Sequence, residues 1–184
     1  MSSRPTIRFG RLEDVPLILS FIKAAAAEQA PGSSVTATLA TLSSTLHLDN
    51  TAPGDSNTDF QIPPGTNQTR FAWPLIVVAP DETVAGLAIY FYNYSTWSAS
   101  PGVMLEELYV LPAYRRRGYG KLLIQAMAKE AERAGCAKME WVCLKENQGP
   151  LRFYEELGAQ QMQDWVILKV SREGIRDLAK GERE

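Results

Sequence analysis

Three consecutive arginines stand directly before two closely spaced glycines. Arg115, Arg116 and Arg117 precede Gly118-Tyr119-Gly120, and Lys121 follows. An apolar segment ends just before this stretch and a helical pattern begins in it, so the helix N-terminus exposes unpaired N–H groups and a partial positive charge. The glycines let an anion approach the backbone closely. The stretch therefore predicts a cradle for a pyrophosphate group.

Spacing separates this cradle from two common phosphate-binding motifs. A Walker A loop requires Ser or Thr after its Gly-Lys pair, but Leu122 follows Lys121. A dinucleotide-binding fingerprint requires a third glycine where Leu123 stands. Two other interpretations remain: a strand end with solvated arginines, and a nucleic-acid patch. The net charge of -2 argues against the nucleic-acid patch.

Two adjacent carboxylates precede the cradle in the same apolar segment. Because side chains alternate along a strand, Glu106, Leu108 and Val110 are expected on one face, with Glu107 and Tyr109 on the other. One carboxylate therefore faces a cleft and the other faces elsewhere. A carboxylate in a cleft is suited to binding a cation or accepting its proton.

The surrounding pattern predicts the elements that hold these residues. It favours a mixed α/β architecture, in which early strands form hairpins and later ones are joined by helices. The strands are expected at 6–9, 74–79, 84–94, 103–111, 139–144 and 165–170, and the helices at 12–30, 35–46, 119–134 and 147–157. The segment Asp49–Arg70 is predicted to be a long loop, and the charged segment 171–184 either a frayed helix or a disordered tail.

Bulk composition is compatible with one globular domain covering residues 1–184. Hydrophobic residues make up 45% and charged residues 22% of the chain. His47, the single histidine, makes a His-based zinc site improbable and is expected at the surface, and Cys136 and Cys143 form no CxxC pair. No apolar run is long enough for a leader or a membrane span, so we expect a soluble cytoplasmic protein. No metal site is expected either.

The stretch Arg115–Gly120 resembles the R/Q-x-x-G-x-G/A signature of the GNAT acetyltransferases. Further segments resemble the spermidine/spermine branch, which includes diamine and thialysine acetyltransferases. They are GLAIYFYNYSTW from Gly86, LEELYV from Leu105, NQGPLRFY from Asn147 and LGA from Leu157. Two features depart from that branch: Ala27 stands where an aromatic residue is expected beside Glu28, and the loop Asp49–Arg70 is longer.

The resemblance implies the GNAT fold, a mixed central sheet flanked by helices whose splayed strands hold acetyl-CoA. It implies that the backbone around Leu108, Tyr109 and Val110 pairs with the pantetheine arm. The remaining cofactor contacts that it implies are Arg115, Arg116, Arg117, Gly118, Tyr119, Gly120, Lys121, Asn147 and Tyr154.

The resemblance also assigns catalytic roles for direct acetyl transfer from acetyl-CoA to an amine. Tyr154 is expected to protonate the departing thiolate, and Glu106 to take a proton from the substrate ammonium through water. For the acceptor site it indicates Glu28, Glu106, Glu107 and Trp165. It further implies a homodimer.

The sequence thus predicts an N-acetyltransferase for a small cationic amine: a polyamine, a diamine or a lysine-like compound. Two alternatives stay open at this point: a protein or peptide acetyltransferase, and a CoA-binding module without catalysis. No nucleic-acid or membrane partner is expected.

Overall fold

The structure is a computed structural model that describes residues 4–49 and 70–181. The chain divides into two compact units, Met1–Val142 and Cys143–Glu184. The predicted long loop falls at residues 50–69, outside the described residues, so its interpretation stays a prediction.

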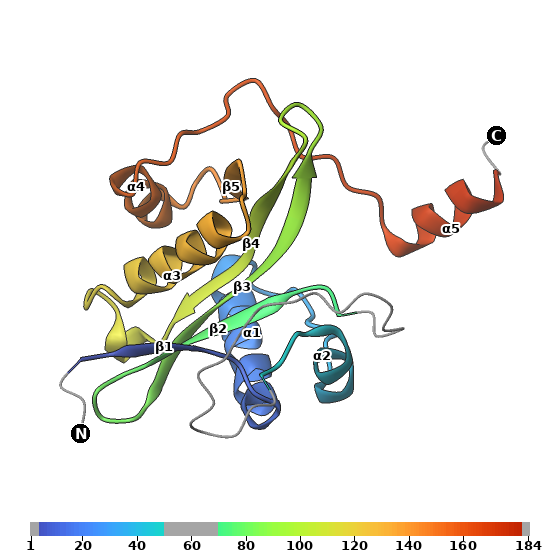
Figure 1. The fold of residues 1–184 in the computed structure, drawn as a ribbon. Coiled ribbons are helices and arrows are strands. Elements are labelled where there is room, and N and C mark those ends of the chain that lie inside the picture. Colours follow the sequence, from blue (N-terminus) through green and yellow to red (C-terminus); the bar gives the residue numbers. More distant parts are fainter. Residues whose placement is uncertain (1–3, 50–69, 182–184) are drawn as a thin grey trace. The chain divides into compact units, whose positions relative to one another are not determined.

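The N-terminal unit is built on a five-stranded sheet in the order β1-β2-β3-β4-β5 (Figure 1). Neighbouring strands are antiparallel, except that β4 and β5 are parallel because α3 crosses between them. This mixed sheet flanked by helices confirms the predicted fold class. The strands are β1 (Thr6–Phe9), β2 (Trp73–Val78), β3 (Val84–Ser95), β4 (Ser100–Val110) and β5 (Lys138–Trp141).

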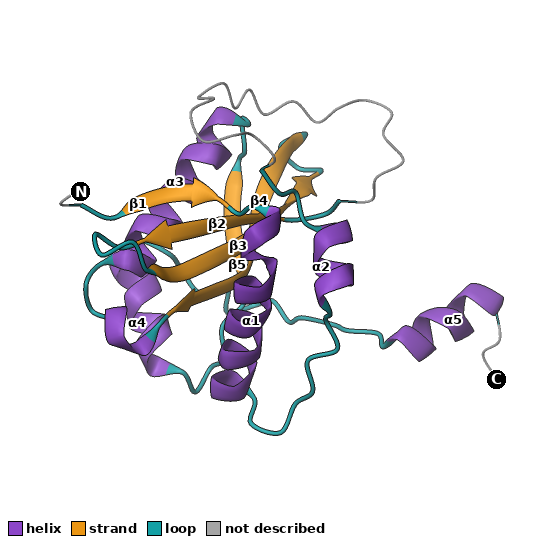
Figure 2. Ribbon diagram, turned by 90° about the horizontal axis from the view of Figure 1, so that it is seen from below, coloured by secondary structure: helices purple, strands orange, loops and turns teal. Residues whose placement is uncertain are grey.

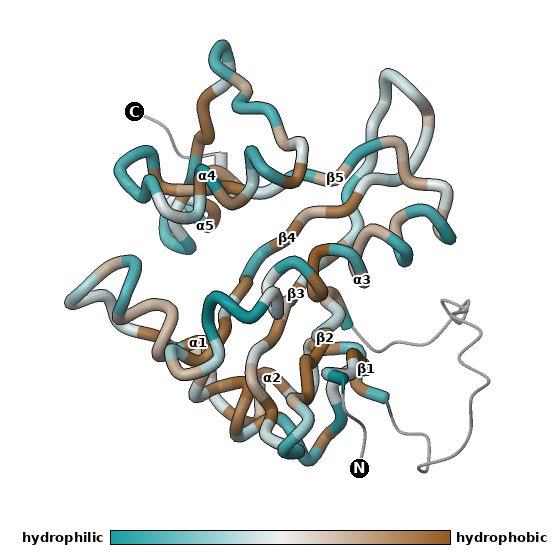
Figure 3. The backbone as a smooth tube through the Cα atoms, turned by 90° about the vertical axis from the view of Figure 1, so that its left-hand side faces the viewer, coloured by the Kyte–Doolittle hydropathy of each residue, from teal (hydrophilic) through white to brown (hydrophobic). Residues whose placement is uncertain are grey.

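Helices α1 (Val15–Gln29) and α3 (Tyr119–Arg133) cover opposite faces of this sheet (Figure 2). On one face, Phe21 of α1 packs with Leu87 and Tyr109 in a buried cluster. On the other, α3 buries Leu123 and Met127, which share its apolar stripe. The strands between them are hydrophobic over much of their length (Figure 3). Burial of both faces is the main source of stability of the sheet.

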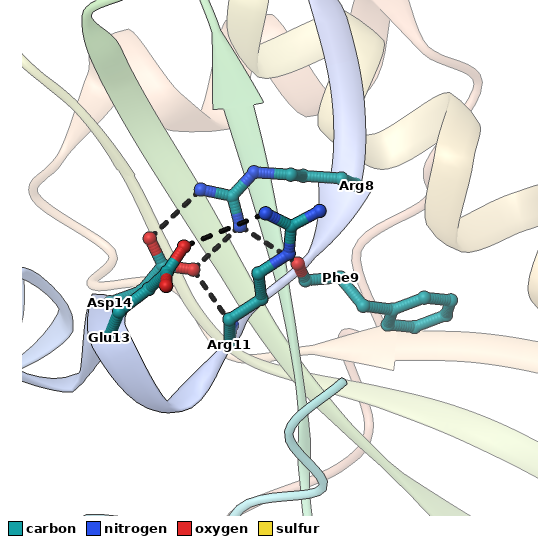
Figure 4. A network of polar contacts seen from close by, with 5 residues as sticks. All are labelled: Arg8, Phe9, Arg11, Glu13 and Asp14. Atoms are coloured by element: carbon teal, nitrogen blue, oxygen red, sulfur yellow. Dashed lines mark hydrogen bonds and ion pairs between the residues drawn. The ribbon is translucent and has the colours of Figure 1, made fainter. Parts of the chain in front are cut away.

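The first turn of α1 is fixed by a buried ion pair (Figure 4). The short 3₁₀ helix η1 (Leu12–Asp14) leads into α1. The Arg8 guanidinium donates two hydrogen bonds to the Asp14 carboxylate, at 2.6 and 2.9 Å, and the Arg11 amide donates a third at 2.7 Å. Burial alone would raise the pKa of Asp14, but these hydrogen bonds outweigh it and lower the pKa. The pair therefore holds β1 against the start of α1.

Helix α2 (Leu39–Thr45) is shorter than the predicted 35–46 segment. Its start is set by Thr38, whose hydroxyl accepts a hydrogen bond from the Thr41 amide at 3.1 Å. Residues 35–38 therefore lie outside the helix.

The C-terminal unit contains α4 (Gln148–Glu156) and α5 (Arg172–Lys180). Ser171 precedes α5 and caps it, because its hydroxyl accepts a hydrogen bond from the Gly174 amide, in the segment predicted as a frayed helix or tail. The prediction of a last strand at Trp165–Val170 is wrong, because these residues have no strand pairing among those described and are exposed. The segment has the β-branched composition of a strand, but that preference requires a neighbouring strand to accept its backbone hydrogen bonds.

Candidate active site

The cradle lies in the turn between β4 and α3, as predicted. The 3₁₀ helix η2 (Pro112–Tyr114) follows β4, and α3 begins after Gly118. Arg116 and Gly118 both have a positive φ, 63° and 81°. For a non-glycine residue such as Arg116 that conformation is uncommon and strained, and such backbone strain concentrates at functional sites. The turn therefore has the sharp path that presents successive N–H groups to an anion.

Tyr114 anchors this turn to the rest of the sheet, a role that sequence reasoning missed. Its hydroxyl donates a hydrogen bond to Asp81 at 2.7 Å, in the turn between β2 and β3. The Arg117 guanidinium lies over the Tyr114 ring, 5.0 Å from its centroid, and the buried Tyr119 ring lies 6.1 Å away. Asp81 shows no sequence signal beyond its position in a turn, so only the fold reveals this contact.

The cations of the cradle divide into two kinds. Arg116 and Lys121 are exposed, and neither has an ion-pair partner in the part of the chain that the structure describes. Arg115 instead donates to both carboxylate oxygens of Glu28, at 2.7 and 2.8 Å, and to the Val110 carbonyl at 2.9 Å. Its guanidinium also lies over the Tyr109 ring, 5.5 Å from the centroid. A residue predicted for the cofactor is thus paired with one predicted for the acceptor.

The outer edge of β4 fits the predicted contact with a pantetheine arm. The parallel pairing with β5 runs from Gly102 to Leu105 and stops there, since β5 ends at Trp141. Residues 106–110 continue β4 without a β5 partner, so no strand pairs with their backbone on that edge. Two of the backbone groups there have side-chain partners instead, since the Val110 carbonyl accepts from Arg115 and the Leu108 amide donates to Glu107. An extended, amide-containing arm can pair with such an edge as another strand would. The residues present therefore fit a CoA-type ligand that runs from β4 to the cradle.

A β-bulge lies at the two predicted carboxylates. Ile89 pairs with Glu107 and Tyr90 pairs with Leu105, so Glu106 is the extra residue on β4. Glu106 is exposed, whereas Glu107 is half-buried and accepts a hydrogen bond from Gln29 of α1 at 3.5 Å, the long limit for such a bond. Bulges re-aim side chains, and they are common beside active sites.

Glu107 is the carboxylate with the unusual environment. Burial is the main cause that raises the pKa of Glu107 to about 7, and the charge of Glu106 adds to the effect. Hydrogen bonds from the Leu108 amide and from Gln29 oppose the rise. Glu107 and Tyr109 both contact α1, which confirms that they share a face of β4.

Ala27 lies in a surface depression of about 380 Å³ rather than in the network of Arg115. Lys23 lines the same depression.

The remaining predicted residues lie in the C-terminal unit. Tyr154 is half-buried on α4, with its ring 5.1 Å from that of Phe153. Asn147 directly precedes α4, and its side chain makes no capping hydrogen bond to that helix. Trp165 is 65% exposed, which does not agree with a core position. The roles proposed for these three residues rest on their sequence positions.

The single histidine and the two cysteines lie outside the site. His47 stacks on the Trp73 ring, with 4.1 Å between the ring centroids, and is half-buried, so it is only partly at the surface. Cys136 and Cys143 are free and half-buried. Within residues 4–49 and 70–181, no three His, Cys, Asp or Glu side chains gather in a group able to hold a metal ion, and no helix has the length and apolarity to cross a membrane.

Comparison with known proteins defines the class of this fold and site. Residues 45–159 match the model of the acetyltransferase (GNAT) family, which is more than half of the chain. The chain belongs to the GNAT acetyltransferase family.

Curated relatives sharpen the comparison within that family. The chain is 34% identical over 100 residues to an L-ornithine N5-acetyltransferase of Arabidopsis thaliana, covering 54% of this chain and 44% of that protein. It is 34% identical over 111 residues to a thialysine N-epsilon-acetyltransferase of Mus musculus, covering 56% and 65%. The matches thus span less than two thirds of the length of these relatives.

Solved structures share the fold. An integron cassette protein from the mobile metagenome of V. cholerae superimposes with a TM-score of 0.71 at 18% identity, covering 97% of this chain and 99% of that one. An aminoglycoside acetyltransferase from a soil metagenome, in complex with sisomicin, gives a TM-score of 0.66 at 15% identity, covering 91% and 95%.

Proposed function

We propose that this protein transfers the acetyl group of acetyl-CoA directly to the primary amine of a small cationic acceptor, such as a polyamine, a diamine or a lysine-like compound. The main support for the proposal is that three features of an acetyltransferase site occur in one short segment of the chain. The unpaired edge of β4, two carboxylates at a bulge and the glycine cradle all lie between Glu106 and Lys121. The ornithine and thialysine enzymes among the relatives support the choice of acceptor.

The cofactor is held by backbone groups and by cations. The edge at Leu108 and Val110 pairs with the pantetheine arm, and an N–H there polarises the thioester carbonyl. The N–H groups at the start of α3, together with Arg116, Arg117 and Lys121, bind the pyrophosphate. Asn147 adds a further contact to the cofactor.

The amine must lose a proton before it attacks the thioester. Glu106, exposed at the bulge, receives this proton through water, and Glu107 is the second acidic group facing the acceptor. The pKa of Glu107 near 7 also makes it a rival proton acceptor, since an efficient base titrates near the working pH. The pH profiles of kcat/KM of Glu106→Gln and Glu107→Gln discriminate the two: the variant that lacks the base loses the acidic limb.

Tyr154 completes the reaction by protonating the CoA thiolate. A phenol with a pKa near 10 is a reasonable partner for a thiolate leaving group with a pKa near 8.5. We further propose that the protein is a cytoplasmic homodimer, which sedimentation velocity and cell fractionation test.

The decisive experiment measures CoA release from acetyl-CoA against a panel of amines. The panel contains spermidine, spermine, putrescine, thialysine, L-ornithine, lysine, an aminoglycoside and a histone-tail peptide. We expect turnover of a small diamine or lysine-like compound, and about a hundredfold loss of kcat in Tyr154→Phe with CoA binding unchanged. Gly118→Glu is the complementary control. Its negative side chain in the cradle should weaken CoA binding, which Tyr154→Phe leaves unchanged.

Three outcomes contradict the proposal in different ways. Turnover of the histone-tail peptide alone indicates a protein acetyltransferase. Tight CoA binding without turnover of any amine indicates a CoA-binding module. An unchanged kcat in Tyr154→Phe removes Tyr154 from the role of acid.

A further inference from the structure

Arg115 stands at the beginning of the cradle, yet its side chain is engaged with the protein. Its Nη2 group binds both oxygens of Glu28, its Nε group binds the Val110 carbonyl, and one face of the guanidinium covers the Tyr109 ring. An arginine held on two nitrogens and one face has little left to offer a phosphate. Arg116 and Lys121 carry no such engagement among the described residues.

Glu28 belongs to the last turn of α1, where a helix is prone to fray. This turn contains no basic residue that could complement its carbonyl groups, and Pro31 follows shortly after. The Arg115 guanidinium joins this turn to Val110, the last residue of β4, because Nη2 binds the Glu28 carboxylate while Nε binds the Val110 carbonyl. Arginine suits this function because its several N–H donors, fixed in one plane, can bind two partners at the same time.

The next residue of that turn is Gln29, which reaches Glu107 at the bulge. A fixed last turn therefore keeps Gln29 beside Glu107 and limits the access of water to that carboxylate. If the turn loosens, Glu107 becomes more exposed.

We propose that Arg115 and Glu28 form a clasp that holds the end of α1 against β4 and so positions Gln29 and Glu107 on the acceptor side of the site, while Arg116 and Lys121 supply the cationic contacts to phosphate. Arg115 is then a positioning residue, and Glu28 acts through Arg115 instead of binding the amine directly. The assignment of ligands rests on the proposed function, but the clasp itself has a readout that requires no turnover.

The first test compares two neighbouring arginines by isothermal titration of the full chain with CoA. We expect Arg116→Gln to weaken CoA binding about tenfold, the effect of one charge-assisted contact. Arg115→Gln should leave the Kd within about twofold of wild type. Arg115→Gln binding CoA as poorly as Arg116→Gln would overturn the division of roles.

The second test follows the Glu107 carboxyl by ¹³C NMR through a pH titration. In wild type we expect titration near the raised value of about 7. In Glu28→Gln and in Arg115→Gln the pKa of Glu107 should fall toward its ordinary value of 4.5. Water reaching the carboxylate removes the largest cause of the rise, which outweighs the loss of the pKa-lowering hydrogen bond from Gln29, the smallest cause. The double variant should show no larger change, since both residues belong to one contact.

Arg116→Gln is the matched control in that titration and should leave Glu107 unchanged. An unchanged Glu107 pKa in both clasp variants would overturn the proposal. Failure of wild type to bind CoA or to acetylate thialysine would count against the proposed function alone, because the titration needs neither ligand. Where thialysine is acetylated, the clasp variants should raise its KM several-fold and leave the KM for acetyl-CoA unchanged.

Discussion

The two ends of α1 are each held by an arginine–carboxylate pair, and the two pairs differ in geometry and in burial. At the start, the Asp14 side chain is 7% exposed and that of Arg8 is 27% exposed. At the end, Glu28 and Arg115 are 47% and 41% exposed. Arg8 uses two guanidinium nitrogens, one for each oxygen of Asp14, whereas the single Nη2 of Arg115 reaches both oxygens of Glu28. The two contacts therefore differ in geometry as well as in exposure to solvent.

This difference indicates what each pair contributes. A buried carboxylate that loses its partner leaves an uncompensated charge, so the first pair matters for folding. An exposed pair is screened by water and adds little to stability, so the second pair matters for where α1 ends. The Arg8–Asp14 pair is a structural anchor. The Arg115–Glu28 pair contributes little to stability, so its role is to position residues of the site.

The largest expected effect is at the buried end. Asp14→Asn should lower the free energy of unfolding by about 2 kcal/mol, because the half-buried Arg8 loses its counter-charge. Urea unfolding at pH 7 measures this as a lower midpoint with an unchanged m-value. An unchanged midpoint would remove the distinction between the two ends.

The pH dependence of that loss has a definite sign. Hydrogen bonds hold the folded pKa of Asp14 below its ordinary 3.8, so its contribution is present above that value and disappears as the pH falls through the folded pKa. The difference between wild type and Asp14→Asn should therefore shrink below about pH 4.

An intermediate effect is expected at Glu107, beside the exposed end. Its folded pKa near 7 exceeds the ordinary 4.5, so the charged carboxylate destabilises the folded state above pH 7, and this penalty vanishes below pH 4.5. Glu107→Gln should raise the free energy of unfolding at pH 8 by about 1–2 kcal/mol and change it little at pH 4. Urea unfolding at both pH values checks this, and an equal change at both would show that ionisation is not the cause.

The smallest effect is expected from Glu28→Gln. Its stability should change by less than about 1 kcal/mol, since an exposed ion pair contributes little. Thermal unfolding at low and high salt measures this small change, which salt should reduce further. A loss as large as that of Asp14→Asn would mean that the clasp is a structural anchor after all.

Local sequence patterns were sufficient to predict where most of the helices and strands lie and that the cradle follows a strand and precedes a helix. The strand Thr6–Phe9 and the helix from Tyr119 agree with the prediction within one or two residues, because alternation and the 3.6-residue period depend on the sequence alone. Trp165–Val170 was predicted wrongly because strand formation depends on a neighbour that composition does not reveal. Thr38 shortened α2 through a single capping hydroxyl.

The sequence by itself determined the family and the order of chemistry along the chain, from the carboxylates at Glu106 and Glu107 to the glycines at Gly118 and Gly120. Only the tertiary structure decided that β4 bulges between these carboxylates, that Tyr114 reaches Asp81, and that Arg115 turns away from the cradle to Glu28. The physical reason is that motifs depend on local spacing, whereas the partner of a charge and its access to water depend on elements 87 residues apart meeting in space.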